Sequence, residues 1–138
     1  MEPEIDKVFR EIDESKLASS GEIKTMKNNI LQKMLFDKDE LKMYHKLLTN
    51  YRYIDEIDEL KYGSYIRWFN IKKKSTLKLL NGGFIIDITN RNGEIVILCK
   101  NGLNKLFNLK MNQSIIFQKN TKQEELLIKI LDHIRSIE

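Results

Sequence analysis

The first third of the chain carries apolar residues at helical spacing. Three stripes follow the i, i+3, i+4, i+7 pattern of an amphipathic helix. Their members are Ile5, Val8, Phe9 and Ile12, then Ile23, Met26, Ile30, Leu31, Met34 and Leu35, then Leu41, Tyr44, Leu47 and Leu48. Pro3 suits a first helical turn, and Ser19-Ser20-Gly21 interrupts the pattern. The spacing therefore predicts two or three amphipathic helices over residues 3–50.

Capping-box pairs indicate where helices begin. In this pattern a side-chain oxygen accepts the backbone N–H three residues later, where a Glu side chain accepts the first residue's N–H in return. The pairs are Ser19 with Glu22, Asp37 with Glu40 and Thr121 with Glu124. The third pair opens an apolar stripe made of Leu126, Leu127, Ile130, Leu131, Ile134 and Ile137. A C-terminal helix is therefore predicted over residues 121–138.

Near residue 60 the pattern changes to that of short strands. The first, Tyr65–Ile71, is rich in aromatic and β-branched residues and follows the turn Leu60-Lys61-Tyr62-Gly63. Strand-like runs follow at residues 79–88, 95–99, 106–111 and 115–117. Asn90-Arg91-Asn92-Gly93 is a hairpin signal, and Asn81-Gly82-Gly83 can supply a bulge or a sharp bend. Five strands at this spacing are typical of a small barrel or sandwich.

These elements together predict an α+β chain in three parts. We expect residues 1–58 to form a helical N-terminal region and residues 59–120 a small basic β-barrel of five antiparallel strands. Residues 121–138 are expected to form a C-terminal helix packed on the same module.

Net charge is unevenly distributed along the chain. The whole sequence carries +4, but residues 61–120 hold 11 basic and 2 acidic residues and so carry +9. Residues 1–60 carry −4 and residues 121–138 carry −1. A segment with this excess attracts polyanions, which makes nucleic acid the first candidate partner.

Basic residues gather around the first predicted strand and the loop after it. The candidate nucleic-acid-binding residues are Arg67, Trp68, Lys72, Lys73, Lys74 and Lys78. Lysine and arginine neutralise phosphates, and exposed aromatic rings stack on bases. Strand alternation places Arg67 and Trp68 on opposite faces, one of which must be core. Two interpretations follow: Trp68 is exposed at the interface, or it belongs to the core and the lysines form a solvated loop tip.

No residue pattern indicates an enzyme or a metal centre. His45 and His133 lie far apart in the sequence and lack further ligands at the spacing of a zinc site. Cys99 ends an apolar strand without a base partner, which favours a small buried hydrophobe over a nucleophile. Asn81-Gly82-Gly83 lacks the spacing of a phosphate-binding loop, and the acidic stretch 55–59 lacks that of a calcium loop. We therefore expect no catalysis, no cofactor and no bound metal.

The sequence also bears on where the protein acts. The acidic N-terminus lacks the apolar stretch of a signal peptide, and no apolar run approaches the roughly 20 residues that span a bilayer. A single cysteine excludes an internal disulfide and suits a reducing compartment. We expect an intracellular protein that makes no membrane contact.

Residues 60–119 resemble an SH3-like small barrel. The features are the Leu60-x-x-Gly63 entry, an aromatic first strand, a glycine-bent second strand and tight hairpins. The resemblance implies a five-stranded antiparallel SH3-like barrel, a fold that hosts peptide readers, nucleic-acid binders and assembly modules.

Four short segments also resemble uncharacterised small proteins of large nucleocytoplasmic DNA viruses. They are Leu60–Asn70, Gly82-Gly83-Phe84, Cys99-Lys100-Asn101 and Ile116-Phe117-Gln118-Lys119. This resemblance implies a viral protein that acts in the host cytoplasm or nucleus, or in the virion.

Two functions follow as hypotheses. The first is a non-enzymatic binding module that associates with nucleic acid through its basic β-barrel face. The alternative is a protein–protein interaction module, such as a virion structural or assembly component. In that case the N-terminal helices would pair with a partner or with a second copy of the chain.

Overall fold

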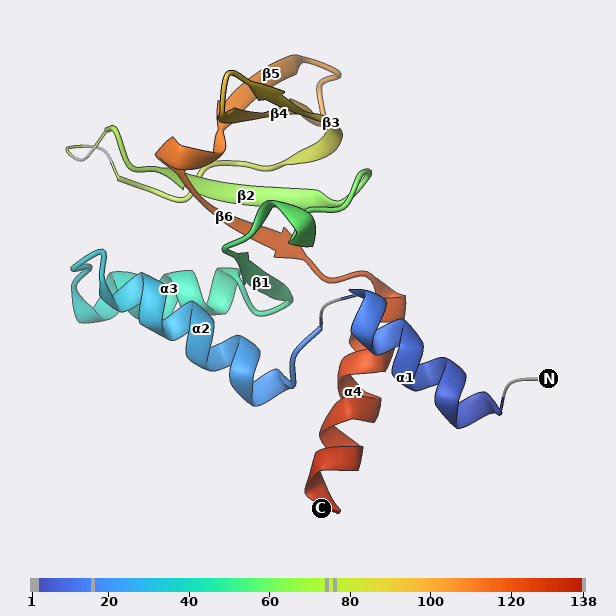
Figure 1. Ribbon diagram of the computed structural model, residues 1–138. Coiled ribbons are helices and arrows are strands. Elements are labelled where there is room, and N and C mark those ends of the chain that lie inside the picture. Colours follow the sequence, from blue (N-terminus) through green and yellow to red (C-terminus); the bar gives the residue numbers. More distant parts are fainter. Residues whose placement is uncertain (1–2, 16, 74, 76, 138) are drawn as a thin grey trace.

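The chain folds as a mixed α+β structure around one antiparallel sheet (Figure 1). The computed structural model describes residues 3–15, 17–73, 75 and 77–137. The described residues form β1 (Tyr51–Ile54), β2 (Tyr65–Asn70), β3 (Gly83–Arg91), β4 (Glu94–Lys100), β5 (Leu106–Lys110) and β6 (Ser114–Lys119). Two 3-10 turns, η1 (Ile57–Glu59) and η3 (Met111–Gln113), precede β2 and β6. The strand order is β1-β6-β2-β3-β4-β5.

The sheet differs in two ways from the five-stranded closed barrel that the sequence predicts. A sixth strand, β1, lies within residues 1–58, the region expected to be helical, and pairs with β6. The sheet is also open, because among the described residues β1 and β5 are its two ends and do not pair with each other. The predicted strands are present as β2 to β6, and β6 returns beside β2. The α+β class is confirmed, whereas the strand count and the closure were wrong.

The described residues form four helices, three of which begin at their predicted caps. They are α1 (Glu4–Ser15), α2 (Ser20–Gln32), α3 (Lys38–Leu47) and α4 (Lys122–Ser136). Asp37 and Thr121 form complete capping boxes, and the Ser19 hydroxyl accepts the Glu22 N–H at 3.3 Å. Figure 1 shows α2 and α3 beside the β1-β6-β2 part of the sheet, with α1 next to α4. None of these helices is both long and apolar enough to cross a membrane.

The buried face of α2 contains a lysine, which the predicted apolar stripe does not include. Lys27 lies between Ile23 and Leu31 on this face and is almost fully buried. Its Nζ donates to the Leu48 carbonyl at 2.8 Å, just after the end of α3. Carbonyls at a helix C-terminus lack helical partners and attract cations. Burial lowers the pKa of Lys27, and its hydrogen bond joins α2 to α3.

Two apolar clusters lie on opposite faces of the β1-β6-β2 part of the sheet. The cluster between this part and β3 to β5 contains Ile54, Leu60, Ile66, Trp68, Ile85, Ile97, Cys99, Leu109 and Ile116. The cluster beneath α2 and α3 contains Leu31, Tyr44, Leu48, Tyr51, Phe69, Leu79 and Phe117. Strand alternation sends Ile66 and Trp68 into the first cluster, while Phe69 enters the second.

The β3–β4 hairpin forms at the predicted turn. Asn92 has φ of 55° and Gly93 has φ of 86°, so both residues adopt the left-handed conformation that a type I′ turn requires. The Asn90 side chain accepts the Gly93 N–H at 2.8 Å and closes the turn. The hairpin prediction is therefore confirmed.

Gly82 and Gly83 allow close packing and do not form a bulge, which was one of the two roles predicted for them. A Cβ on Gly82 would lie 2.3 Å from the Tyr65 ring, and one on Gly83 would lie 2.8 Å from the Phe107 ring. The irregularity in the ladder lies further along β3, between residues 85 and 87. The glycines are required because two aromatic rings approach the backbone at the start of β3.

A buried charge network holds α4 to the sheet. Arg52 on β1 donates to Glu124 Oε2 at 2.6 Å, and Lys61 Nζ donates to the same oxygen at 2.8 Å. The other oxygen, Oε1, accepts the Thr121 N–H at 2.9 Å and completes the capping box. Arg52 also donates to the Asn120 side chain. One carboxylate thus both caps α4 and attaches it to β1.

Candidate nucleic-acid interface

The lysines predicted to bind nucleic acid lie on the connection between β2 and β3. Lys72, Lys73 and Lys78 are exposed, and Lys74 lies outside the described residues. Asn70 fixes the start of the connection, since its side-chain oxygen accepts the Lys72 N–H at 3.0 Å and its carbonyl accepts the Lys73 N–H at 3.3 Å. Three lysine side chains are therefore accessible at one end of β2.

The second half of this connection runs back along β2. Leu79 pairs with Phe69, and the Leu80 N–H donates to the Trp68 carbonyl at 2.9 Å. A hollow of about 290 Å³ at this end of β2 is lined by Asn70, Lys73, Lys78 and Leu80. The backbone pairing thus brings Lys73 and Lys78 to the same hollow, although they are separated in sequence.

Arg67 and Trp68 are less accessible than the lysines. The Arg67 side chain is half-buried, and its Nε donates to the Leu80 carbonyl at 3.1 Å. Trp68 is 8% exposed, and its ring stacks on Phe107 with centroids 5.2 Å apart. Of the two interpretations of Trp68, the core position is therefore confirmed. We remove Trp68 from the candidate interface because a buried ring cannot stack on a base from solution.

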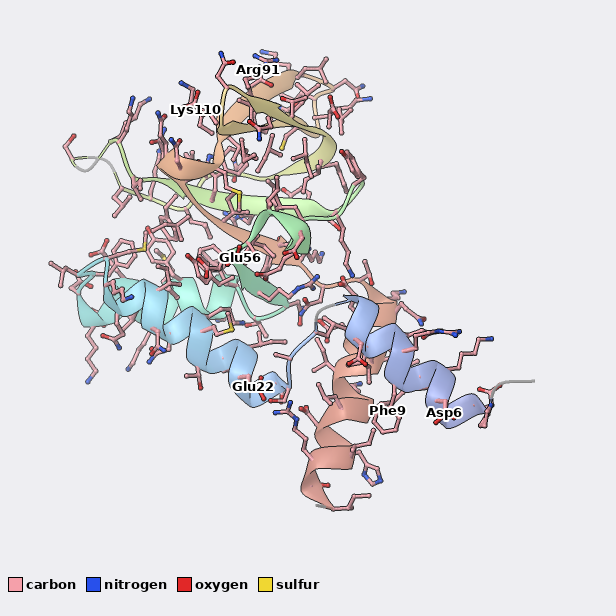
Figure 2. The ribbon with its side chains drawn as sticks, in the orientation of Figure 1. Asp6, Phe9, Glu22, Glu56, Arg91 and Lys110 are labelled. Carbon is pink, nitrogen blue, oxygen red and sulfur yellow. The ribbon has the colours of Figure 1, made fainter. Side chains whose placement is uncertain are left out.

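The other basic residues of the middle segment are either paired with carboxylates or exposed. Lys61 and Lys110 each contact a glutamate, at 2.8 Å and 3.4 Å. The exposed residues are Arg91, Lys100, Lys105 and Lys119. Figure 2 shows Arg91 and Lys110 on the β3–β5 side of the molecule, at the opposite end from Asp6 on α1. This part of the positive charge therefore lies away from the acidic N-terminal helix.

Phe84, an exposed aromatic residue that the sequence did not indicate as a binding residue, lies on the β3–β5 side. Tyr65 on β2 pairs with Phe84 on β3, which pairs with Lys100 on β4, which pairs with Leu106 on β5. Direct cross-strand partners point to the same face, and the Tyr65 and Phe84 ring centroids are 5.1 Å apart. Phe84 is 49% exposed. Alternation within each strand could not have grouped these residues, because they come from four strands whose register is set by pairing.

His45 and Cys99 are packed against other residues, whereas His133 is exposed. His45 Nε2 lies 3.1 Å from Asn28 Oδ1, which links α3 to α2, and burial lowers the pKa of His45. His133 is exposed on α4. Cys99 is fully buried, as predicted, and burial raises the pKa of its thiol to about 12. Within the part of the chain that the structure describes, no group of three or more His, Cys, Asp and Glu side chains could hold a metal ion.

Comparisons with known proteins gave no match. No protein-family model matches this chain, and neither a curated protein nor a solved structure was found to be similar to it. Any functional assignment therefore rests on the surface chemistry of the chain.

Proposed function

We propose that this protein is a non-enzymatic module that binds nucleic acid through the lysines of the β2–β3 connection. The observation that carries the proposal is the exposure of Lys72, Lys73 and Lys78 at one end of β2. They belong to a segment with a net charge of +9. Lysines neutralise phosphates and release counterions, a contribution that does not depend on base sequence. The expected ligand is therefore DNA or RNA of mixed sequence.

The origin and location of the protein are part of the same proposal. The resemblance to small proteins of large nucleocytoplasmic DNA viruses supports a viral protein that acts inside the host cell or in the virion.

Replacing the three exposed lysines should weaken binding and flatten its dependence on salt. For Lys72→Gln/Lys73→Gln/Lys78→Gln we expect the slope of log affinity against log salt to fall in magnitude by about 2, because each phosphate contact contributes roughly 0.7–0.9. Fluorescence anisotropy with a labelled mixed-sequence oligonucleotide, between about 50 and 200 mM salt, measures this slope.

The matched control removes the same charge from the helices. Lys42, Lys46 and Lys129 are exposed on α3 and α4, and a triple glutamine variant at these positions should bind as the wild type does. If both variants lost the same affinity, the effect would depend on net charge alone. That result would contradict an interface at the connection. A wild-type protein that does not bind at low salt would contradict the proposed function as a whole.

A second candidate function, self-association, rests on an apolar hollow beside the same connection. Leu35, in the turn between α2 and α3, is 90% exposed. The hollow next to it has a volume of about 380 Å³ and is lined by Ile30, Lys33, Met34, Leu35, Ile71, Leu77 and Ile115. We propose α1 of a second copy as its occupant, because the first turn of that helix carries Glu4 and Asp6 and its Phe9 is 40% exposed. An acidic helix with an apolar side chain complements an apolar hollow next to lysines.

Leu35→Asp should convert such an oligomer to a monomer. Leu35 has φ of 59°, a conformation that Asp tolerates better than Leu, so the substitution should leave the fold intact. Sedimentation velocity over a range of protein concentrations measures the effect. Leu103→Asp is the control, because Leu103 is 78% exposed after β4 and distant in the fold. A wild-type protein that sediments as a monomer at every concentration contradicts this second function.

A further inference from the structure

Two aromatic and two basic side chains are neighbours on one face of the sheet where β2 meets β3 and β4. Tyr65 packs at the margin of the apolar cluster beneath α2 and α3, so it belongs to the face that these helices cover. Its cross-strand neighbours Phe84 and Lys100 continue that face, and both are exposed. Arg67, two residues along β2, points to the same face. From Arg67 to Lys100 the order is therefore cation, ring, ring, cation.

We propose that Arg67, Tyr65, Phe84 and Lys100, which we call the Phe84 row, form a stacking platform for single-stranded nucleic acid. This inference rests on the proposed function and specifies its ligand. With about half of its surface in solvent, the Phe84 side chain offers an aromatic surface to an unpaired base. Bases inside a duplex are already stacked, so they cannot use this surface. The platform therefore favours single strands.

Lys100 is placed to contact the phosphate next to a base on Phe84. The two residues are direct cross-strand partners, and Cα atoms in such pairs are about 4.5–5.5 Å apart. The acidic residues of the two strands lie further along the ladder, with Asp87 opposite Leu98 and Glu94 opposite Arg91. Positive charge therefore predominates at the end of the sheet that carries the Phe84 row.

Tyr65 holds the platform in an ordered arrangement. Its hydroxyl accepts the Gly82 N–H at 3.1 Å, and its ring meets the Phe84 ring at 66°. Gly82 leaves room for the Tyr65 ring, which a Cβ at that position would occupy. Because Tyr65 is fixed by both contacts, Phe84 is supported on one side before any ligand arrives. Such preorganisation lowers the cost of ordering side chains on binding.

The variant Phe84→Leu tests the platform because it removes the ring but keeps an apolar side chain against Tyr65. We expect the full-length variant to bind a labelled oligothymidylate between roughly 5-fold and 150-fold more weakly than the wild type, the range for loss of one stacked base. Binding to a mixed-sequence duplex of the same length should be unchanged, because it depends on phosphate contacts. Fluorescence anisotropy at low salt measures both affinities.

Leu126→Ala is the control, since Leu126 is 53% exposed on α4 and lies outside the sheet. It should bind both ligands as the wild type does. Lys100→Gln is a second variant that tests the platform if Phe84→Leu does not fold. For oligothymidylate, it should reduce the slope of log affinity against log salt by about 0.7 in magnitude.

The outcomes separate the two proposals. If Phe84→Leu and the wild type bind oligothymidylate equally well, the platform is overturned and the proposed function stands. If the wild type binds neither oligothymidylate nor the duplex, both are overturned. A loss of affinity confined to the single strand, and absent from the Leu126→Ala control, supports the platform.

Discussion

Glu124→Gln should lower the free energy of unfolding by about 3–5 kcal/mol, because it leaves a buried charge without its partner. Arg52 lies 2.6 Å from Glu124, and the two side chains are only 7% and 4% exposed. The amide that replaces the carboxylate carries no charge to balance the guanidinium. Urea unfolding of both proteins, followed by circular dichroism, measures the difference.

Glu125→Gln is the matched control for this prediction. Glu125 follows Glu124 in the first turn of α4 and is less buried. The substitution removes the same charge and should cost less than about 1 kcal/mol. A similarly small loss for Glu124→Gln would contradict the role of the buried network in holding α4 to the sheet.

The same network should make stability depend on acid. Burial tends to raise the pKa of Glu124, but hydrogen bonds from Arg52 and Lys61 outweigh burial and lower this pKa from 4.5 to about 2. A carboxyl group with a lowered pKa stabilises the fold above its unfolded value, and this contribution is lost as the pH falls through the folded value. The free energy of unfolding should therefore decline from about pH 5 to about pH 2. The decline should be shallower in Glu124→Gln, which urea titrations at several pH values would show.

Phe69→Ala should cost about 3–5 kcal/mol of stability. The Phe69 side chain is fully buried, with its ring centroid 5.4 Å from Phe36, 5.0 Å from Tyr44 and 6.0 Å from Phe117. Phe36 lies in the turn before α3, Tyr44 lies in α3, and Phe117 lies in β6. Truncation therefore leaves a cavity at the junction between the helices and the sheet. The midpoint of urea unfolding measures the loss.

Phe9→Ala provides the comparison, because Phe9 is 40% exposed on α1. Its truncation removes less buried apolar surface and should cost about 1 kcal/mol. If the two alanine variants unfold at the same urea concentration, Phe69 does not hold the α3 region on the sheet.

The helix starts and the hairpin could be predicted from the sequence because each depends on neighbouring residues. The capping boxes at Asp37 and Thr121 need only a Glu three positions later. The turn at Asn92 and Gly93 needs only two residues that tolerate left-handed backbone.

The strand β1 could not be predicted because its stabilising contacts lie elsewhere in the chain. Tyr51–Ile54 is 4 residues long and pairs with β6. Locally, Arg52 suggests an exposed position, yet it is buried against Glu124, which is 72 residues away. Strand spacing likewise indicates how many short strands there are, but neither their order nor whether the sheet closes.

The candidate site, too, could be predicted only where it does not depend on contacts distant in the sequence. Alternation separates Trp68 from Arg67, but it does not show that both faces of β2 carry an apolar cluster, with Trp68 in one and Phe69 in the other. Gly82 suggests a bulge, although the Tyr65 ring is the reason for a glycine there. The exposed lysines of the β2–β3 connection could be located from sequence, because lysines in a connection are seldom buried.

The open sheet has a consequence for aggregation. An unpaired strand edge can take up a strand from another molecule and so begin a fibril. Both edge strands here are short, with 4 residues in β1 and 5 in β5. Lys105 precedes β5 and Lys110 is its last residue. The pairing of two β5 edges would therefore bring like charges together. The basic character that suits a polyanionic ligand would thereby also oppose the pairing of two β5 edges.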